Sequence, residues 1–412
     1  MSIEVTSYYE KLHFFLICAL SFFPILPRGV HSTLIIIVTV LALLYFLLNG
    51  RKFWTTKKTL RLISLGSLSV IYIGSLFHLD NFDSGAKMIV RTAPILLLPF
   101  SFLLLNIQYW NKQKLKIVLY LYIAVNFLLL SYLHISFFEI IYYSKITSWE
   151  IRSIIEESID VHGTYLSLWI SFAVLSTLWL LFKTNKSKII IGIKVLLMIY
   201  FLYWLYILGA RMPLFGTTIA FAWLLLSLLK VSRKHILLIF SLLLFTGSLV
   251  FWKPVLEKIQ EVKNYENAIP PGKYENTYPL ISNEDIRSVI YYCASQKIIQ
   301  KPIFGYGIGN VNIELQQCYD LEFGYTDLFT RFHFNSHSQY LQVFLAAGIV
   351  GLLAYLLSVF LWIRWSLIKL YIPFLLLTFL CLVFENILSR HDGVIFFSFF
   401  NSILFFSENK EN

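Results

Sequence analysis

The feature that most constrains this chain is a succession of long apolar blocks, each near the length of a membrane-crossing helix. Leu34–Leu48 and Leu196–Leu208 hold almost no side chain that water would favour. Charged residues make up 14% of the chain, against about 25% in an ordinary soluble protein. A helix needs about 20 apolar residues to cross a bilayer, and backbone groups in lipid must be satisfied within the segment. The blocks do not alternate as membrane β-strands do, so they predict an all-α polytopic membrane protein.

These blocks predict about twelve transmembrane helices. No cleavable signal peptide is expected, because Met1–Glu10 is polar and not basic and no small-residue cleavage site follows the first block. The expected spans are Leu12–Pro27, Ser32–Leu48, Leu60–Leu79, Met88–Asn106, Leu115–Ser136, Gly163–Phe182, Ile189–Leu208, Pro213–Leu229, Ile236–Trp252, Ser338–Trp362, Leu370–Leu388 and Val394–Phe406.

The placement of the basic residues predicts the topology. They cluster, without any Asp or Glu, in the turns after the even-numbered spans, and the positive-inside rule makes those turns cytoplasmic. Both termini are then cytoplasmic, and the net charge of +11 marks orientation and attraction to anionic lipid, with no nucleic-acid partner implied. The residues concerned are Arg51, Lys52, Lys57, Lys58, Arg61, Lys112, Lys114, Lys116, Lys183, Lys186, Lys188, Lys230, Arg233, Lys234, Arg364 and Lys369.

The opposite side of the membrane carries the polar segments. Phe137–Asp160 is rich in acidic residues, and about Lys253–His337 is polar, mixed in charge and too long for a bare connector. We therefore divide the chain into a bundle of nine spans over 1–252, a large outer loop with short helices over 253–337, and three spans with a short cytoplasmic tail over 338–412. No internal repeat is seen, which weighs modestly against a secondary transporter.

Two of the four cysteines, Cys293 and Cys318, share the outer loop. A disulfide is chemically permitted there, but their spacing fits no zinc pattern. The sequence leaves the bridge open, and free thiols are the favoured expectation. Cys18 and Cys381 fall in spans and read as small hydrophobic side chains.

Three outer-side features carry candidate chemistry. His337, in H-F-N-S-H-S-Q-Y-L-Q at 333–342, stands where the loop meets the tenth span, and its near-neutral pKa suits a general base. Capping and interfacial snorkelling are the alternative roles for this stretch, and His333 is the competing base. Arg211 lies in the short outer turn L-G-A-R-M-P, and Arg287 begins a helix that ends before Pro302. Arginine suits bidentate phosphate binding, although Arg211 could instead snorkel to lipid headgroups.

Taken in order, these pieces resemble the O-antigen ligase and O-antigen polymerase superfamily of bacterial envelope glycosyltransferases. The matching strings are the turn with Arg211, the block from Arg287 through P-I-F-G-Y-G-I-G-N, H-S-Q-Y-L with G-I-V-G-L-L, F-E-N-I-L-S-R-H-D-G, and H-G-T-Y at 162–165. Ser338 stands where family members commonly have Asn, and Gly163 where the related subgroup has Pro. The glycines at 305, 307 and 309 read as turn chemistry rather than as a nucleotide loop.

The resemblance implies a GT-C-like glycosyltransferase in the bacterial inner membrane, with its active site on the periplasmic face and with no metal or nucleotide cofactor. The donor would be an undecaprenyl-diphosphate-linked oligosaccharide, and the acceptor a second glycan, a lipid A core or a protein. His337 would be the base, while Arg211 and Arg287 would hold the diphosphate. Four further residues are expected at substrate-binding depth or, alternatively, in ordinary interhelical pairs. These residues are His162, Arg91, Glu385 and Arg390.

The acceptor stays open at this stage. Ligase, polymerase and protein-glycosylating activities share the donor, and nothing in the sequence separates them. The rival from another class is a transporter or flippase of lipid-linked sugar, which would call for ionisable residues near the membrane midplane. Most spans here are bare of charge in their middle.

Overall fold

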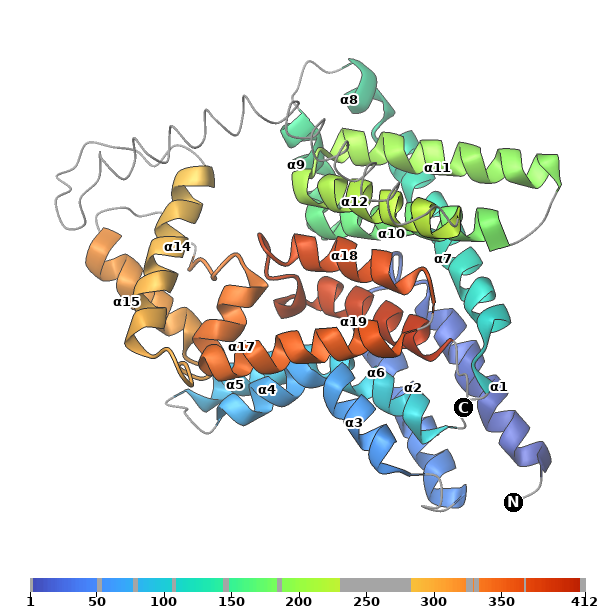
Figure 1. Cartoon of the computed structure of the whole chain (residues 1–412). Helices are drawn as coiled ribbons and strands as arrows, with labels where there is room; N and C mark the ends of the chain where they lie inside the picture. The colour runs from blue at the N-terminus through green and yellow to red at the C-terminus, as the bar shows by residue number, and fades with distance from the viewer. Residues whose placement is uncertain are drawn as a thin grey trace.

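The protein is represented by a computed structural model that describes residues 3–49, 54–76, 81–105, 109–143, 148–183, 187–229, 283–323, 329, 333–366 and 368–407. Over these residues the elements are α-helices and one short 3-10 helix, arranged as a bundle with a smaller helical segment at one end (Figure 1). The predicted all-α class is confirmed for the described part of the chain.

The helices follow the apolar blocks. Those of the first half are α1 (Ile3–Leu20), α2 (Arg28–Asn49), α3 (Thr56–Leu65), α4 (Ser67–Ser75), α5 (Phe82–Thr92), α6 (Pro94–Leu104), α7 (Lys112–Ser136), α8 (Phe138–Tyr143), α9 (Ser148–Ile159), α10 (Gly163–Lys183), α11 (Lys188–Leu208) and α12 (Arg211–Leu228). Those of the second half are α14 (Asn283–Gln300), α15 (Val311–Phe323), α17 (Gln339–Trp365), α18 (Tyr371–Cys381), the 3-10 helix η4 (Ile387–Ser389) and α19 (His391–Phe406).

Six of the described helices are long and apolar enough to cross a membrane, or seven if the bent pair α5 and α6 counts as one span. They are α2, α7, α10, α11, α12 and α17, and α18 and α19 are shorter apolar helices. Each predicted span that falls on described residues overlaps a helix or a helix pair, while Ile236–Trp252 lies outside the described residues. The chain is therefore a multi-pass helical membrane protein, and the count of twelve stays a prediction.

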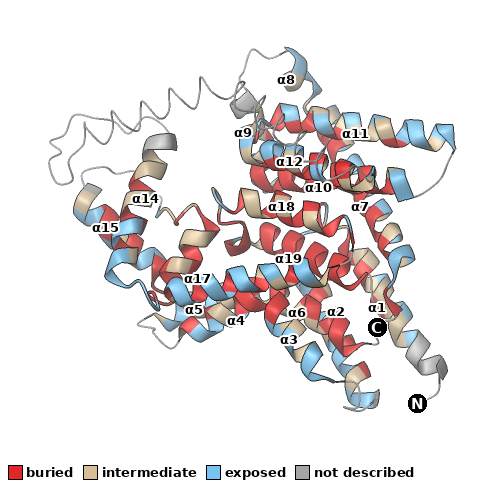
Figure 2. Cartoon of the chain, in the orientation of Figure 1, coloured by how far each residue is buried: buried red, intermediate tan, exposed pale blue. Residues whose placement is uncertain are grey.

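The core lies around α10 and α19. Figure 2 shows α10 and α19 coloured almost wholly as buried, whereas α11 carries many exposed residues. Helix α2 likewise has exposed apolar side chains. Leu196 of α11 is 68% exposed, and Ile36 of α2 is 56% exposed. A helix that is apolar on every side belongs inside a bundle, and one that shows apolar side chains outward suits a lipid surround. The two classes of helix mark the interior and the rim.

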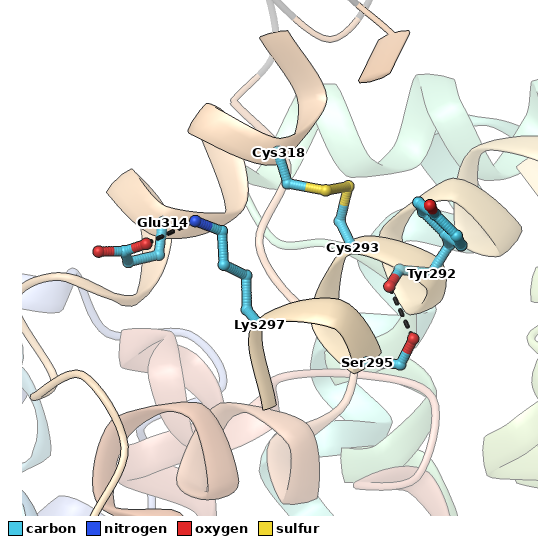
Figure 3. The surroundings of a disulfide bond; sticks show 6 residues. All are labelled: Tyr292, Cys293, Ser295, Lys297, Glu314 and Cys318. Atoms are coloured by element: carbon cyan, nitrogen blue, oxygen red, sulfur yellow. Dashed lines mark hydrogen bonds and ion pairs between the residues drawn. A yellow bond between two sulfur atoms is a disulfide. The ribbon is translucent and has the colours of Figure 1, made fainter. Parts of the chain in front are cut away.

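The helices α14 and α15 form the smaller segment beside α17 (Figure 1). Cys293 and Cys318 join them through a disulfide with Cα atoms 5.7 Å apart, so the expectation of free thiols was wrong (Figure 3). On the same helix pair, the Lys297 ammonium lies 2.6 Å from the Glu314 carboxylate. The predicted loop began at residue 253, and its first part lies outside the described residues, so its boundaries remain a prediction.

The glycine turn after α14 is fastened to α17 by the backbone. Tyr306 N donates to Leu345 O, and Ile349 N donates to Pro302 O, both at 2.8 Å. Gly348 has φ of +63° at this kink, and a Cβ there would lie 2.1 Å from Ile303 O. Only glycine permits so close a backbone approach with that dihedral. The glycines of the two sequence blocks thus fix the turn after α14 to the first half of α17, as turn chemistry predicts.

Candidate functional site

The segment that leads into α17 is held against the segment between α18 and α19. Asn386 Nδ2 donates to Ser336 Oγ at 3.0 Å and to Gln342 Oε1 at 3.2 Å, and Ser336 Oγ donates to the same Gln342 oxygen at 2.9 Å. Gln339 is fully buried, and its side chain accepts from Leu388 N and donates to the Tyr72 hydroxyl. These satisfied buried polar groups rigidify the two loops, which brings the H-S-Q-Y-L-Q and F-E-N-I-L-S strings together.

His337 sits at the turn that this network fixes. Its φ of +44° is a left-handed value uncommon outside glycine, and its N–H donates to the Asn335 side chain at 2.9 Å. The imidazole Nδ1 lies 3.9 Å from the Glu385 Oε2, and no described group gives it a hydrogen bond. The other Glu385 oxygen lies 3.2 Å from an Arg287 nitrogen. The geometry therefore places a carboxylate between an arginine and the candidate base.

The electrostatics around His337 keep it neutral. Burial, together with the positive charges of Arg287 and Arg390 and with His162, lowers its pKa to about 4. At neutral pH the imidazole is therefore unprotonated and has a lone pair to accept a proton. The low pKa also makes it a weak base until negative charge approaches the arginines.

A second cluster forms at the start of α10. Glu156 Oε1 accepts from Arg152 Nε and from Gly163 N, both at 2.6 Å, and lies 4.0 Å from His162 Nε2. Burial, partly offset by Glu156, lowers the pKa of His162. Gly163 can donate this hydrogen bond because it has an N–H, which the proline expected at this position would lack. Residues of α9 thus hold the H-G-T-Y string in place at the start of α10.

A cavity of about 590 Å³ lies beside these clusters. Three of the predicted residues line it, namely His162, Arg91 and Arg390. The Arg91 guanidinium donates to Ser389 O at 3.0 Å across the wall. The full lining is Arg28, Met88, Arg91, Glu156, Asp160, Val161, His162, Tyr165, Asn312, Asn335, Gln342, Asn386, Ser389, Arg390, His391 and Asp392. Its size and charged lining suit a polar headgroup rather than a purely apolar ligand.

Arg28 is the main residue of this wall that the sequence reasoning missed. It makes a two-point contact with Asp392, at 3.2 and 2.9 Å, and reaches Asp160 at 2.8 Å. It ties the start of α2 to α19 and to the loop before α10. One signal was available, since Arg28 is a basic residue in a short turn that the sequence predicts to be on the outer side, where the positive-inside rule predicts few.

Two further candidates from the sequence, Arg211 and His333, are exposed in the structure. Arg211 begins α12 with an exposed side chain, is outside the cavity lining, and is not among the charges that shift the pKa of His337. Its role in binding diphosphate stays a prediction. His333, the competing base, is exposed, and its Nδ1 lies 3.1 Å from the Gln316 side chain. The structure therefore gathers His337, Arg287, Glu385, Arg390 and His162.

Comparison with known proteins supports the resemblance seen in the sequence. Residues 196–356 match the family described as O-antigen ligase, a range that takes in Arg211, Arg287 and His337. No curated protein matches the chain. This match and the ordered motifs together support a likeness of residues 196–356 to the O-antigen ligase and O-antigen polymerase superfamily.

Proposed function

We propose that this protein transfers a glycan from an undecaprenyl-diphosphate carrier to a hydroxyl of an acceptor, at the periplasmic face of the bacterial inner membrane. The observation that carries the proposal is the cluster of His337, Glu385, Arg287 and Arg390 beside the polar cavity. Arg211 is retained as a further diphosphate ligand on the strength of its place in the family motif. The family match supports glycosyl transfer in general.

The residues suit each bond change of this reaction. The acceptor oxygen attacks the anomeric carbon while His337 takes the hydroxyl proton, and the bond from that carbon to the diphosphate oxygen breaks. The electron pair of that bond leaves with the lipid diphosphate, whose charge Arg287 and Arg390 are placed to stabilise. Glu385, near the His337 Nδ1, would stabilise the imidazolium that forms. Attack from the side opposite the leaving group inverts the donor carbon.

Donor binding would also strengthen the base. The cationic neighbours that depress the pKa of His337 are the ones proposed to hold the diphosphate. A bound diphosphate would offset their charge, which raises the pKa of His337 toward the working pH. The imidazole would then be a weak base in the free protein and a better one when the donor is present.

Two observations support a periplasmic site. The disulfide between Cys293 and Cys318 lies in the same outer segment as Arg287, and such bonds persist in oxidising compartments. The acid-free basic turns are typical of cytoplasmic connections, and they alternate with the segments that carry the site. We infer that both termini are cytoplasmic.

The test is transfer by the purified protein in nanodiscs, given a synthetic undecaprenyl-diphosphate oligosaccharide and each acceptor class in turn. The expected result is a longer or newly linked glycan together with release of the lipid diphosphate. A transporter would instead move the intact donor between leaflets, so a liposome assay of donor exposure runs in parallel. Donor movement without any transfer product would overturn the proposal.

A further inference from the structure

The end of α14 and the turn after it carry apolar side chains on the surface of the protein. Ile299 is 71% exposed, Ile303 is 55% exposed and Phe304 is 59% exposed. These three residues, which we name the apolar corner, fall in the segment that the sequence predicts to be a polar outer loop. Isolated apolar side chains on a surface need no explanation, whereas a group of them marks a surface that interacts with something apolar.

Backbone contacts with α17 set the depth of the apolar corner in the bundle. Ile349 N donates to Pro302 O at 2.8 Å, so the corner lies beside the kink at Gly348. From Gly348 to its end at Trp365, α17 is about 27 Å long at 1.5 Å per residue. The hydrocarbon core of a bilayer is about 30 Å thick, and the sequence predicts the Trp365 end to be cytoplasmic. The apolar corner therefore meets the outer edge of that core.

Helices α3 and α4 lead to the same depth. Ile308 N, in the turn that follows the corner, donates to Ser75 Oγ at 3.1 Å, and Ser75 is the last residue of α4. Helix α3 begins at Thr56 beside Lys57 and Lys58, in a turn that the sequence predicts to be cytoplasmic. From Thr56 to Ser75 the two helices span at most about 30 Å, and α4 packs on α17. A second helical path across the membrane thus also ends at this turn.

The surface next to the apolar corner is one that faces lipid. Val350 N donates to Ile303 O at 3.4 Å, and Val350 and Leu353 of α17 are 49% and 58% exposed. Helix α17 is one of the candidate spans, so these side chains are placed to meet acyl chains. Within the same turn, the Lys301 ammonium lies 4.6 Å from the centre of the Tyr306 ring. Lysine and tyrosine side chains, with an apolar body and a polar tip, are typical of the boundary between lipid and water.

We propose that the apolar corner inserts into the outer leaflet of the bilayer, where its partner is the acyl chains of phospholipids. Helix α14 is then anchored in lipid at its C-terminal end, and Arg287 lies about 18 Å back along the helix from Ile299. The hydrogen bonds between the turn and α17 make this anchor rigid, so it holds Arg287 at a fixed height above the lipid surface. This contact with lipid does not depend on the proposed function, so either can fail without the other.

Photocrosslinking of the full-length protein in proteoliposomes tests the contact. p-Benzoylphenylalanine, whose excited ketone reacts with nearby C–H bonds, replaces Ile303, and the vesicles contain phosphatidylethanolamine and phosphatidylglycerol. After irradiation and removal of free lipid, intact-mass spectrometry should show a chain that is heavier by one phospholipid. The same replacement at Leu353, on the lipid-facing side of α17, is the positive control and should give the same adduct. Both side chains are more than half exposed, so the larger group can be accommodated.

The matched negative control is Leu321, an apolar residue of α15 that is 83% exposed. The disulfide joins this part of α15 to Cys293, well before Ile303 along α14, so Leu321 lies away from the corner. We expect a lipid adduct at Ile303 and none at Leu321. No adduct at Ile303 would place the corner in water, and a crosslinked dimer in place of the lipid adduct would mean that a second copy of the chain covers it. Equal lipid adducts at Ile303 and Leu321 would reject the corner as a specific contact. Each of these three results would overturn the proposal.

Discussion

Two histidines, His13 and His337, show how different the surroundings of the same side chain are in this bundle. His13, in α1, is fully buried, its Nε2 lies 3.3 Å from Ser101 Oγ and its Nδ1 meets the Tyr109 hydroxyl. His337 keeps 25% of its side chain exposed, and its Nδ1 has a carboxylate at 3.9 Å but no described hydrogen-bond partner. One ring is closed in by its neighbours, and the other is left with capacity for a ligand or a proton.

The surroundings of the two rings differ in the same way. His13 packs edge-on against Phe102 and Tyr109, near Lys114 at the start of α7. His337 lies near Arg287, Arg390 and His162, beside a cavity of about 590 Å³. A buried polar group with all its partners contributes to stability, whereas one held without a partner costs free energy and is retained for another reason. In this protein the ring nitrogen without a described partner belongs to His337, which stands in the family motif.

The largest expected effect is on His337. His337→Ala should lower glycan transfer by about 10²–10⁴-fold, the usual contribution of a general base, while the protein still folds and binds donor. The measurement is transfer by purified protein, with donor binding determined separately. Transfer near the wild-type rate would place the base elsewhere and leave His337 as a residue that shapes the turn before α17.

The matched control is His13→Ala. This change removes the partner of the buried Tyr109 hydroxyl, which costs about 1–3 kcal/mol of stability. We expect a lower thermal midpoint in detergent and an unchanged transfer rate per folded molecule. If His13→Ala lost transfer as fully as His337→Ala, the contrast between the two rings would fail.

The next largest effect on transfer is expected when the planar guanidinium of Arg287 is replaced. Arg287→Lys keeps the charge but loses the two-point geometry that suits a diphosphate and the contact with Glu385. We expect transfer to fall about 10–100-fold, in line with one or two charge-assisted hydrogen bonds. Arg364→Lys, at the far end of α17, is the control and should have no effect. Full activity in Arg287→Lys would show that this position supplies charge alone.

Most residues of the candidate site could be named from the sequence, because each stands out within its own short stretch of the chain. His337 stands at a loop-to-span boundary and Glu385 interrupts an apolar run, so each is conspicuous in the printed chain. Arg28 and its two carboxylates were not foreseen, since Asp160 and Asp392 lie 132 and 364 residues away along the chain. Such pairs form only when the spans have packed, and no spacing rule predicts them.

The helix boundaries also show how far the sequence alone can predict the structure. The span expected at Met88–Asn106 is instead the pair α5 and α6, which begins at Phe82 and bends before Pro94. Hydropathy found the apolar stretch, but the polar first turns of α5 hid its helical start. The disulfide was missed because the separation of 25 residues between its cysteines fits no pattern, and only the packing of α14 on α15 brings them within reach.

The pH dependence offers a finer comparison between the free and the donor-bound site. With the pKa of His337 lowered to about 4, transfer measured as kcat/KM should hold down to about that pH and be lost as protonation removes the base below it. The acid limb of kcat should lie higher by about one unit or more, because bound diphosphate offsets the charges of Arg287 and Arg390. Acid limbs at the same pH would mean that the donor does not neutralise those arginines.

The smallest expected effect on transfer comes from the disulfide that joins α14 to α15. It holds together the two helices that carry Arg287 and the cavity residue Asn312, and neither of its cysteines lines the cavity. The double change Cys293→Ser and Cys318→Ser releases a closed loop worth roughly 3 kcal/mol in a chain-entropy account. We therefore expect earlier local unfolding, seen as faster hydrogen exchange and proteolysis in α14 and α15, with transfer lowered only a few-fold at low temperature.

Cys18→Ser plus Cys381→Ser is the control, since those thiols are unbridged and lie in other helices. A loss of transfer as large as that of Arg287→Lys would mean that the bond sets the position of Arg287, and an unchanged exchange rate would mean that the fastening of the glycine turn to α17 already holds the segment.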